Sequence, residues 1–152
     1  MKKLILLIAI CFCSLSGGFS QSTIKDLSDF VELAKMPLED LKTQLTINDW
    51  YVAKSRKEVE GETVSYKYAF SISYEYYDHK LLRVENSNVS LTSLMFTNEE
   101  LLQGIKEQLS TLRFKYEKTI RNKLIYSIGN NGLFLTEKAE RGYYRIDFFN
   151  YL

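Results

Sequence analysis

Asp78 and His79 are the residues of this sequence best suited to acid–base chemistry. His79 is the single histidine of the chain, and an aspartate can orient a histidine ring as a general base. No nucleophile motif, such as a serine elbow between glycines, accompanies the pair. The stretch from Tyr77 to Lys80 predicts an exposed turn. We therefore expect no catalytic residue and no enzyme, with catalysis by Asp78 and His79 as a weaker alternative.

Metal and cofactor chemistry lack suitable residues. The two cysteines, Cys11 and Cys13, precede the expected mature chain, which then has no disulfide, thiolate nucleophile or cysteine ligand. One histidine is too few for an ordinary zinc site, and no phosphate-binding or dinucleotide-binding motif occurs. The GNNG stretch, residues 129–132, is typical of a hairpin turn. We expect neither a metal nor a cofactor.

The first twenty residues have the pattern of a secretory signal peptide. A lysine-rich start precedes an apolar run over Leu4–Phe12, and Gly18 and Ser20 are small residues suited to cleavage before Gln21. The apolar run is about half the length of a membrane-spanning helix. We expect a periplasmic or secreted protein with no membrane span in the mature chain, and a single domain over 21–152.

The charge of the expected mature chain is close to neutral. The whole sequence has 20 Lys and Arg against 19 Asp and Glu. Removal of residues 1–20, which contain two lysines and no acid, leaves 18 against 19. This balance gives no reason to expect nucleic acid or an anionic membrane as a partner.

Large outward side chains near the C-terminus are the candidate binding residues. In the strand expected over Tyr143–Tyr151, the alternating residues Tyr144, Ile146 and Phe148 form the inward set. Aromatic residues and arginine on the opposite face are typical of protein interfaces. The expected partner-binding residues are Tyr143, Arg145, Phe149 and Tyr151, together with Tyr51 and Tyr77. Since this strand ends the chain, we also expect it at a sheet edge.

A second alternating row predicts the core. Large residues occupy every second position from Val64 to Ile72, with small or charged residues between them. We expect Tyr66, Tyr68 and Phe70 to pack against helices. The helix residues expected to contact them are Leu27, Val31, Ile105 and Leu109.

Three helices are expected to cover a sheet. Apolar residues recur at helical spacing after Thr23, and Pro37 suits the start of a second helix ending near Leu45. The sequence TNEE, from Thr97 to Glu100, is typical of a helix start capped by Thr97. Alternating runs predict the strands Trp50–Val59, Val64–Ser73, Leu81–Glu85, Val89–Phe96, Leu112–Ile120, Lys123–Ile128, Leu133–Lys138 and Tyr143–Tyr151, of which Leu112–Ile120 is expected to be half-buried.

The expected fold class is α+β, an antiparallel sheet with helices packed on one face. The segment Leu41–Trp50 aligns without a gap with Ile105–Phe114. This match predicts a repeated unit of helix plus four strands, over 22–96 and 97–152. The order of elements is similar to that of the β-lactamase-inhibitory proteins, which implies a non-enzymatic inhibitor. Those proteins have disulfides, and this mature chain has no cysteine.

We expect a non-enzymatic protein-binding module of the bacterial envelope, of the inhibitor, immunity or accessory-subunit type. Its binding surface would be the open, tyrosine-rich face of the sheet, and its partner another envelope or secreted protein. The alternative is a carrier of a small molecule or lipid, with a cavity between helices and sheet. A small outer-membrane β-barrel and an enzyme are less favoured, the barrel because charged outward residues are costly in lipid.

Overall fold

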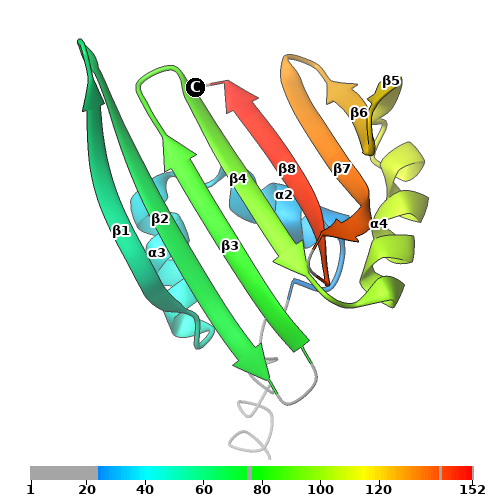
Figure 1. Ribbon diagram of the computed structural model, residues 1–152, viewed down its shortest axis with the longest axis horizontal. Coiled ribbons are helices and arrows are strands. Elements are labelled where there is room, and N and C mark those ends of the chain that lie inside the picture. The colour runs from blue at the N-terminus through cyan, green and yellow to red at the C-terminus, as the bar shows by residue number, and fades with distance from the viewer. Residues whose placement is uncertain (1–23, 75–76, 141, 152) are drawn as a thin grey trace, which may run out of the picture.

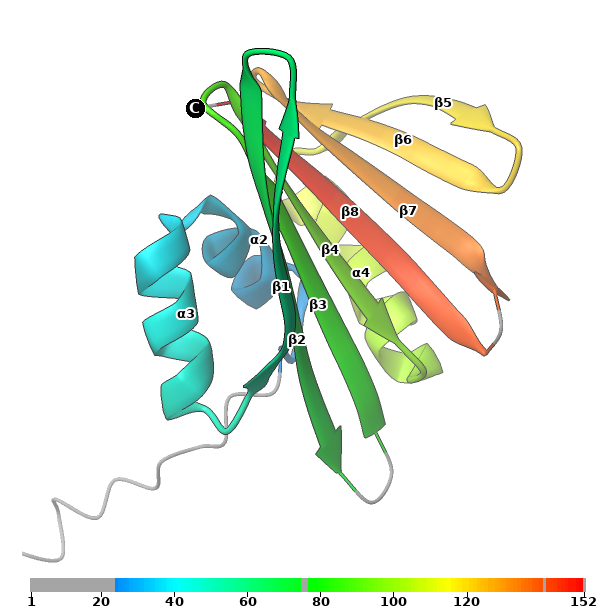
Figure 2. The same cartoon turned by 60° about the vertical axis from the view of Figure 1, so that its left-hand side comes forward.

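Eight antiparallel strands form one sheet, and the described helices lie on one of its faces (Figures 1 and 2). The computed structural model describes residues 24–74, 77–140 and 142–151, apart from the side chains of residues 73–78 and 138–140. The expected signal peptide and its cleavage before Gln21 lie outside these residues. The helices are α2 (Leu27–Lys35), α3 (Leu38–Ile47) and α4 (Glu99–Thr111). The strands are β1 (Tyr51–Glu60), β2 (Thr63–Tyr74), β3 (Tyr77–Glu85), β4 (Val89–Phe96), β5 (Lys115–Ile120), β6 (Lys123–Ile128), β7 (Asn131–Glu140) and β8 (Tyr143–Tyr151).

This arrangement confirms the predicted α+β class. None of the described helices is both long enough and apolar enough to cross a bilayer.

The strand order is β1-β2-β3-β4-β8-β7-β6-β5, which places the two four-strand meanders side by side with β4 and β8 at the centre. β8 pairs with β4 on one side and with β7 on the other. The expectation that β8 is an edge strand is therefore wrong. Its pairing with β4 joins segments far apart in the chain, so local sequence patterns do not reveal it. The edges are β1 and β5, and each carries an irregularity in its register, which opposes pairing with another chain.

The core lies between the helices and the inward face of the sheet. Phe70 and Ile72 are buried there, as are Ile146 and Phe148 of β8. The helix residues expected in this core, Leu27, Val31, Ile105 and Leu109, are all buried in the same cluster. Tyr68 packs against it and is only partly buried.

The prediction that Tyr66 belongs to the core is wrong, since its exposed fraction is 39%. The tip of the β1–β2 hairpin extends past the helices (Figure 1). Tyr66 lies near that tip, where the helix-side contact given for it is the ammonium of Lys57, 5.9 Å from its ring. Alternation identifies the face of a strand, but it does not indicate where the covering layer ends.

The helix starts differ by a few residues from those expected. Asp26 caps α2, where its carboxylate accepts a hydrogen bond from the Asp29 amide at 2.9 Å. Asn98, rather than Thr97, caps α4 and accepts from two amides of the first turn. Asn and Asp are as good as hydroxyl residues at this position, so the local pattern does not decide between neighbours.

The ends of α3 and α4 have the same backbone geometry. Asp49 and Arg113 both have a positive φ, of 63° and 61°. The amides of Trp50 and Phe114 each donate to the carbonyl five residues earlier, at 3.0 and 2.9 Å. This is the Schellman motif, and it occurs at positions aligned by the proposed repeat. A repeated unit accounts for the match; the repeat itself stays a prediction.

The segment after α4 corrects another expectation. The strand over Leu112–Ile120 was expected to be half-buried, but Leu112 is the C-cap of α4 and Phe114 is buried in the core before β5 begins. β5 itself is exposed at every residue. An edge strand beyond the helices has no layer to pack against.

Arg83 of β3 joins the helices to the sheet. Its side chain is 1% exposed. The guanidinium donates to the carbonyls of Ala34 and Met36, at the end of α2, and to the hydroxyl of Thr92 on β4. It also donates to the carboxylate of Glu85 through Nε and Nη2. A cation at this end of a helix satisfies its last carbonyls and its dipole.

Candidate functional site

The sheet face opposite the helices is the candidate binding surface, and we call it the open face. No described helix covers it (Figure 2). Strand pairing places large apolar residues from four adjacent strands next to one another on this face. We call this group the apolar centre; its members are Leu82 and Val84 of β3, Leu91 and Met95 of β4, Phe149 of β8 and Phe134 of β7. All six are half-buried.

The rings of Phe134 and Phe149 form the densest part of the apolar centre. Their centroids are 4.8 Å apart and their planes are inclined by 52°. Phe149 is paired with Leu91 on the other side, and Leu91 with Val84. Contiguous apolar side chains across four strands are more than a solvated face requires, and such patches on soluble proteins are commonly functional.

A polar network lies among the members of the apolar centre: Ser93 is paired with Leu82 and with Asp147, and Asp147 is paired with Phe134. The hydroxyl of Ser93 donates to Asp147 Oδ1 at 2.5 Å, and Arg145 Nε donates to the same oxygen at 2.7 Å. Arg145 Nη2 also donates to Ser93 at 3.2 Å. Ser93 and Asp147 are buried, while the Arg145 side chain is 39% exposed. The network therefore fixes the guanidinium and leaves part of it accessible.

The candidate residues on β8 lie together on the open face. Its odd-numbered residues share one side of the strand, as the pairing of Arg145 with Met95 and of Phe149 with Leu91 shows. Tyr143, at the start of the strand, is in contact with Lys80. The Lys80 Nζ donates to the Tyr143 hydroxyl at 2.8 Å and lies 4.4 Å from its ring centroid. Tyr151 is exposed at the end of the strand.

The two tyrosines predicted from other strands are not part of this group. Tyr51 lies at the start of β1 and pairs with Ser71, which places it on the open face. Four strand spacings, about 19 Å, separate it from Arg145 in the same row. Tyr77 begins β3, and its side chain is among those outside the described residues.

Cationic margins border the apolar centre on both sides. On β1 and β2 these residues are Lys54, Arg56 and Lys67; on β5 and β6 they are Lys115, Lys118 and Lys123. Strand register places all six on the open face.

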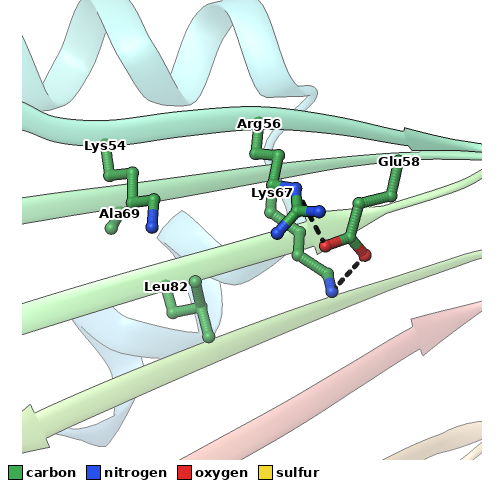
Figure 3. Close-up of a pocket in the computed structure, with 6 residues that line it drawn as sticks. All are labelled: Lys54, Arg56, Glu58, Lys67, Ala69 and Leu82. Carbon is green, nitrogen blue, oxygen red and sulfur yellow. Dashed lines mark ion pairs between the residues drawn. The ribbon is translucent and has the colours of Figure 1, made fainter.

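A shallow hollow of about 180 Å³ lies over the first margin, lined by its three cations with Glu58, Ala69 and Leu82 (Figure 3). Glu58 forms ion pairs with Arg56 and Lys67 there. The hydrogen bond from Lys67 holds the pKa of Glu58 below its usual value. On the other margin, the hydrogen bond from Ser127 lowers the pKa of Glu117, assisted by Lys115.

A second hollow, of about 330 Å³, lies on the helix side. It is lined by residues of α2, by Leu112 and Phe114 after α4, and by Ile128 of β6. Glu32 and Lys35 stand among its lining residues. Its volume is at the lower end of the range found for small-molecule sites.

His79 does not lie in an exposed turn, so that prediction is wrong. Residues 77–80 belong to β3, and His79 is 4% exposed on the helix side of the sheet. Its ring lies 6.5 Å from that of Trp50, which is also buried. The side chain of Asp78 is outside the described residues. The polar residues around His79 suggested a turn, but the pairing of β3 with β2 extends the strand.

The described residues contain no cluster of histidine, cysteine and acidic side chains that could hold a metal ion.

Comparison with family models, with curated proteins and with solved structures finds no match.

Of the apolar centre, the sequence prediction identified Phe149 and missed the other five members. The signal was present as adjacent apolar pairs, in which one residue must face away from the core: Leu81-Leu82, Phe134-Leu135 and Phe148-Phe149.

Proposed function

We propose that this chain is an exported, non-enzymatic protein-binding module that holds its partner against the open face. The observation that carries the proposal is the apolar centre, which crosses four strands and has no described element over it. An interface of this kind has an apolar middle and a polar surround. The fixed guanidinium of Arg145 beside the apolar centre supplies a hydrogen-bonding group of the type enriched at binding hot spots.

The sheet gives this surface rigidity. Each strand that contributes to the apolar centre is paired on both sides. Ser93 and Asp147 constrain Arg145 before any partner arrives. A preorganised surface loses less entropy on binding than a flexible one. Together these features support recognition of a folded protein by a stable face.

The test is capture of a partner with the purified mature chain, followed by quantitative binding. Phe149→Ala and Leu91→Ala should each weaken binding by about 1–3 kcal/mol, the usual range for interface residues near a hot spot. Ile47→Ala is the matched control, since Ile47 is an exposed apolar residue on α3. A partner held equally by all these variants, or lost only with Ile47→Ala, would refute binding through the open face.

The carrier alternative has one observation in its favour, the hollow between α2 and β6. Lipid or small-molecule extraction from the native protein, followed by mass analysis, tests it directly. A stoichiometric ligand that is lost in Val31→Trp, a change that fills this hollow, would favour the carrier. The enzyme alternative is tested by His79→Ala, which we expect to reduce stability but to leave partner binding intact.

A further inference from the structure

The charges of this nearly neutral chain are divided between its two faces. The helices α2, α3 and α4 are acidic: they contain Asp29, Glu32, Glu39, Asp40, Glu99, Glu100 and Glu107 against Lys35, Lys42 and Lys106. The open face is basic. Its described cations are Lys54, Arg56, Lys67, Lys80, Lys115, Lys118, Lys123 and Arg145, against Glu58, Glu60, Glu117 and Asp147. The net charge of the sequence conceals this division.

The positive charge lies where it can act on a partner. Arg145 is neutralised by Asp147, so most of the excess charge belongs to the two margins, and Lys80 of β3 supplies the rest. The margins begin on β2 and β6, which are five strand spacings apart, or about 24 Å. A patch of this width matches a standard interface of about 800 Å² per partner. One partner surface could therefore touch the apolar centre and both margins.

We propose that the open face binds an acidic protein surface, one that presents an apolar patch bordered by Asp or Glu side chains. This inference rests on the proposed function and specifies its partner. Carboxylates opposite the margins would complement their charge, which favours association rate and orientation. The apolar centre would provide most of the buried area.

Other occupants fit less well. An anionic membrane favours protruding apolar side chains that insert among lipids, but every residue of the apolar centre is half-buried. Single-stranded nucleic acid stacks its bases on exposed aromatic faces, whereas Phe134 and Phe149 pack against one another. A second copy meeting face to face would oppose like charges. A second copy meeting through its helices would offer acidic residues without a matching apolar patch.

The experiment uses two synthetic peptides with the same Leu-Phe-Leu centre, one flanked by aspartates and the other by lysines. Each is titrated into isotope-labelled mature protein, and the backbone amide shifts are followed by NMR. We expect the aspartate peptide to shift amides of the strands that carry the apolar centre and the two margins, with weaker binding as salt is raised. Equal binding of the lysine peptide, or shifts confined to α2–α4, would overturn the acidic partner.

Charge reversals on one strand supply a matched control. The double variant Lys54→Glu/Arg56→Glu changes the open face of β1, while Lys57→Glu changes the helix side of the same strand. The double variant should weaken binding of the aspartate peptide about tenfold, a loss of about 1.4 kcal/mol. Lys57→Glu should have little effect. An equal loss with Lys57→Glu would mean that only the overall charge matters, and would overturn a margin-specific site.

Two further measurements separate this inference from the proposed function. If Phe149→Ala releases a captured partner and the double charge reversal does not, the binding module stands and its acidic partner is wrong. If neither Phe149→Ala nor the double charge reversal weakens binding of the captured partner, both proposals are wrong. Sedimentation with vesicles of equal parts phosphatidylcholine and phosphatidylglycerol tests the membrane. Vesicle binding that the double variant abolishes would assign the margins to lipid and overturn the proposal.

Discussion

Replacement of Arg83 by alanine should be among the most damaging single changes to this fold. The guanidinium is buried at the point where α2 ends above the sheet, and it donates to Ala34, Met36, Thr92 and Glu85. Alanine would leave the Ala34 carbonyl and the Thr92 hydroxyl without this donor, and it would open a cavity. Each buried polar group left unsatisfied costs about 1–3 kcal/mol.

The expected loss of unfolding free energy is about 3–5 kcal/mol, as for other buried pairs from which one partner is removed. Glu85 keeps the figure from being larger, because its side chain is 23% exposed and water can solvate the carboxylate. For a domain of this size, a loss of about 4 kcal/mol corresponds to a fall in Tm of roughly 8 to 16 °C.

Urea titration followed by tryptophan fluorescence is a suitable assay, since Trp50 is the single tryptophan and is buried. Arg83→Lys should fall between wild type and alanine, because an ammonium cannot reproduce the planar fork of a guanidinium. Arg56→Ala is the control, with a side chain 66% exposed. A loss below about 1 kcal/mol for Arg83→Ala, or one equal to that of Arg56→Ala, would refute the anchoring role of Arg83.

Three further predictions concern a core residue, a helix end and an ionisable group. Phe70→Ala should cost about 3–5 kcal/mol in denaturant titrations, while its half-buried neighbour on the open face, Ser71→Ala, should cost under about 1 kcal/mol; similar losses would mean that the faces of β2 are reversed. Asp49→Gly should raise stability by about 0.5–1 kcal/mol, because φ is 63° and glycine adopts this conformation without strain; a loss would contradict this. In an NMR titration, the pKa of Glu58 should lie below the usual glutamate value and rise in Lys67→Met. The stabilisation from this pair is present above the usual glutamate pKa and is lost as pH falls through the lowered value.

The helices and strands of this fold could be predicted from the sequence, because they depend on interactions between residues close together in the chain. Hairpins are set by alternation and turn residues a few positions apart, and helices by apolar spacing and caps. For this reason β6 and β8 begin and end where expected. The order of the strands in the sheet could not be predicted from the sequence. It depends on the pairing of β4 with β8, which are far apart in the chain. The edge position expected for β8 was wrong for the same reason.

The candidate site was predictable in part. Alternation along β8 placed Arg145 and Phe149 on the face opposite the core. It gave no information on the strands beside β8, so Leu91 and Phe134 were not recognised as their neighbours. The mispredicted His79 has a similar origin. Whether a polar residue near a strand end is exposed depends on the residues that pack over it. For His79 these include Trp50, which is distant in sequence.

The central pairing of β4 with β8 also has consequences for how the chain folds. Every other ladder between described strands joins neighbours in sequence and can form as a hairpin. The central ladder must close a long loop, so we expect its formation to limit the rate of folding. The backbone amides of Leu27 and Ser28, at the start of α2, donate to the side-chain Oε1 of Gln108 in α4. Docking of α2 therefore also requires the second half of the chain. Until β8 is in place, β4 has an unpaired edge next to apolar residues. During synthesis, this is the stage at which the chain would be most prone to aggregate and would benefit most from a chaperone.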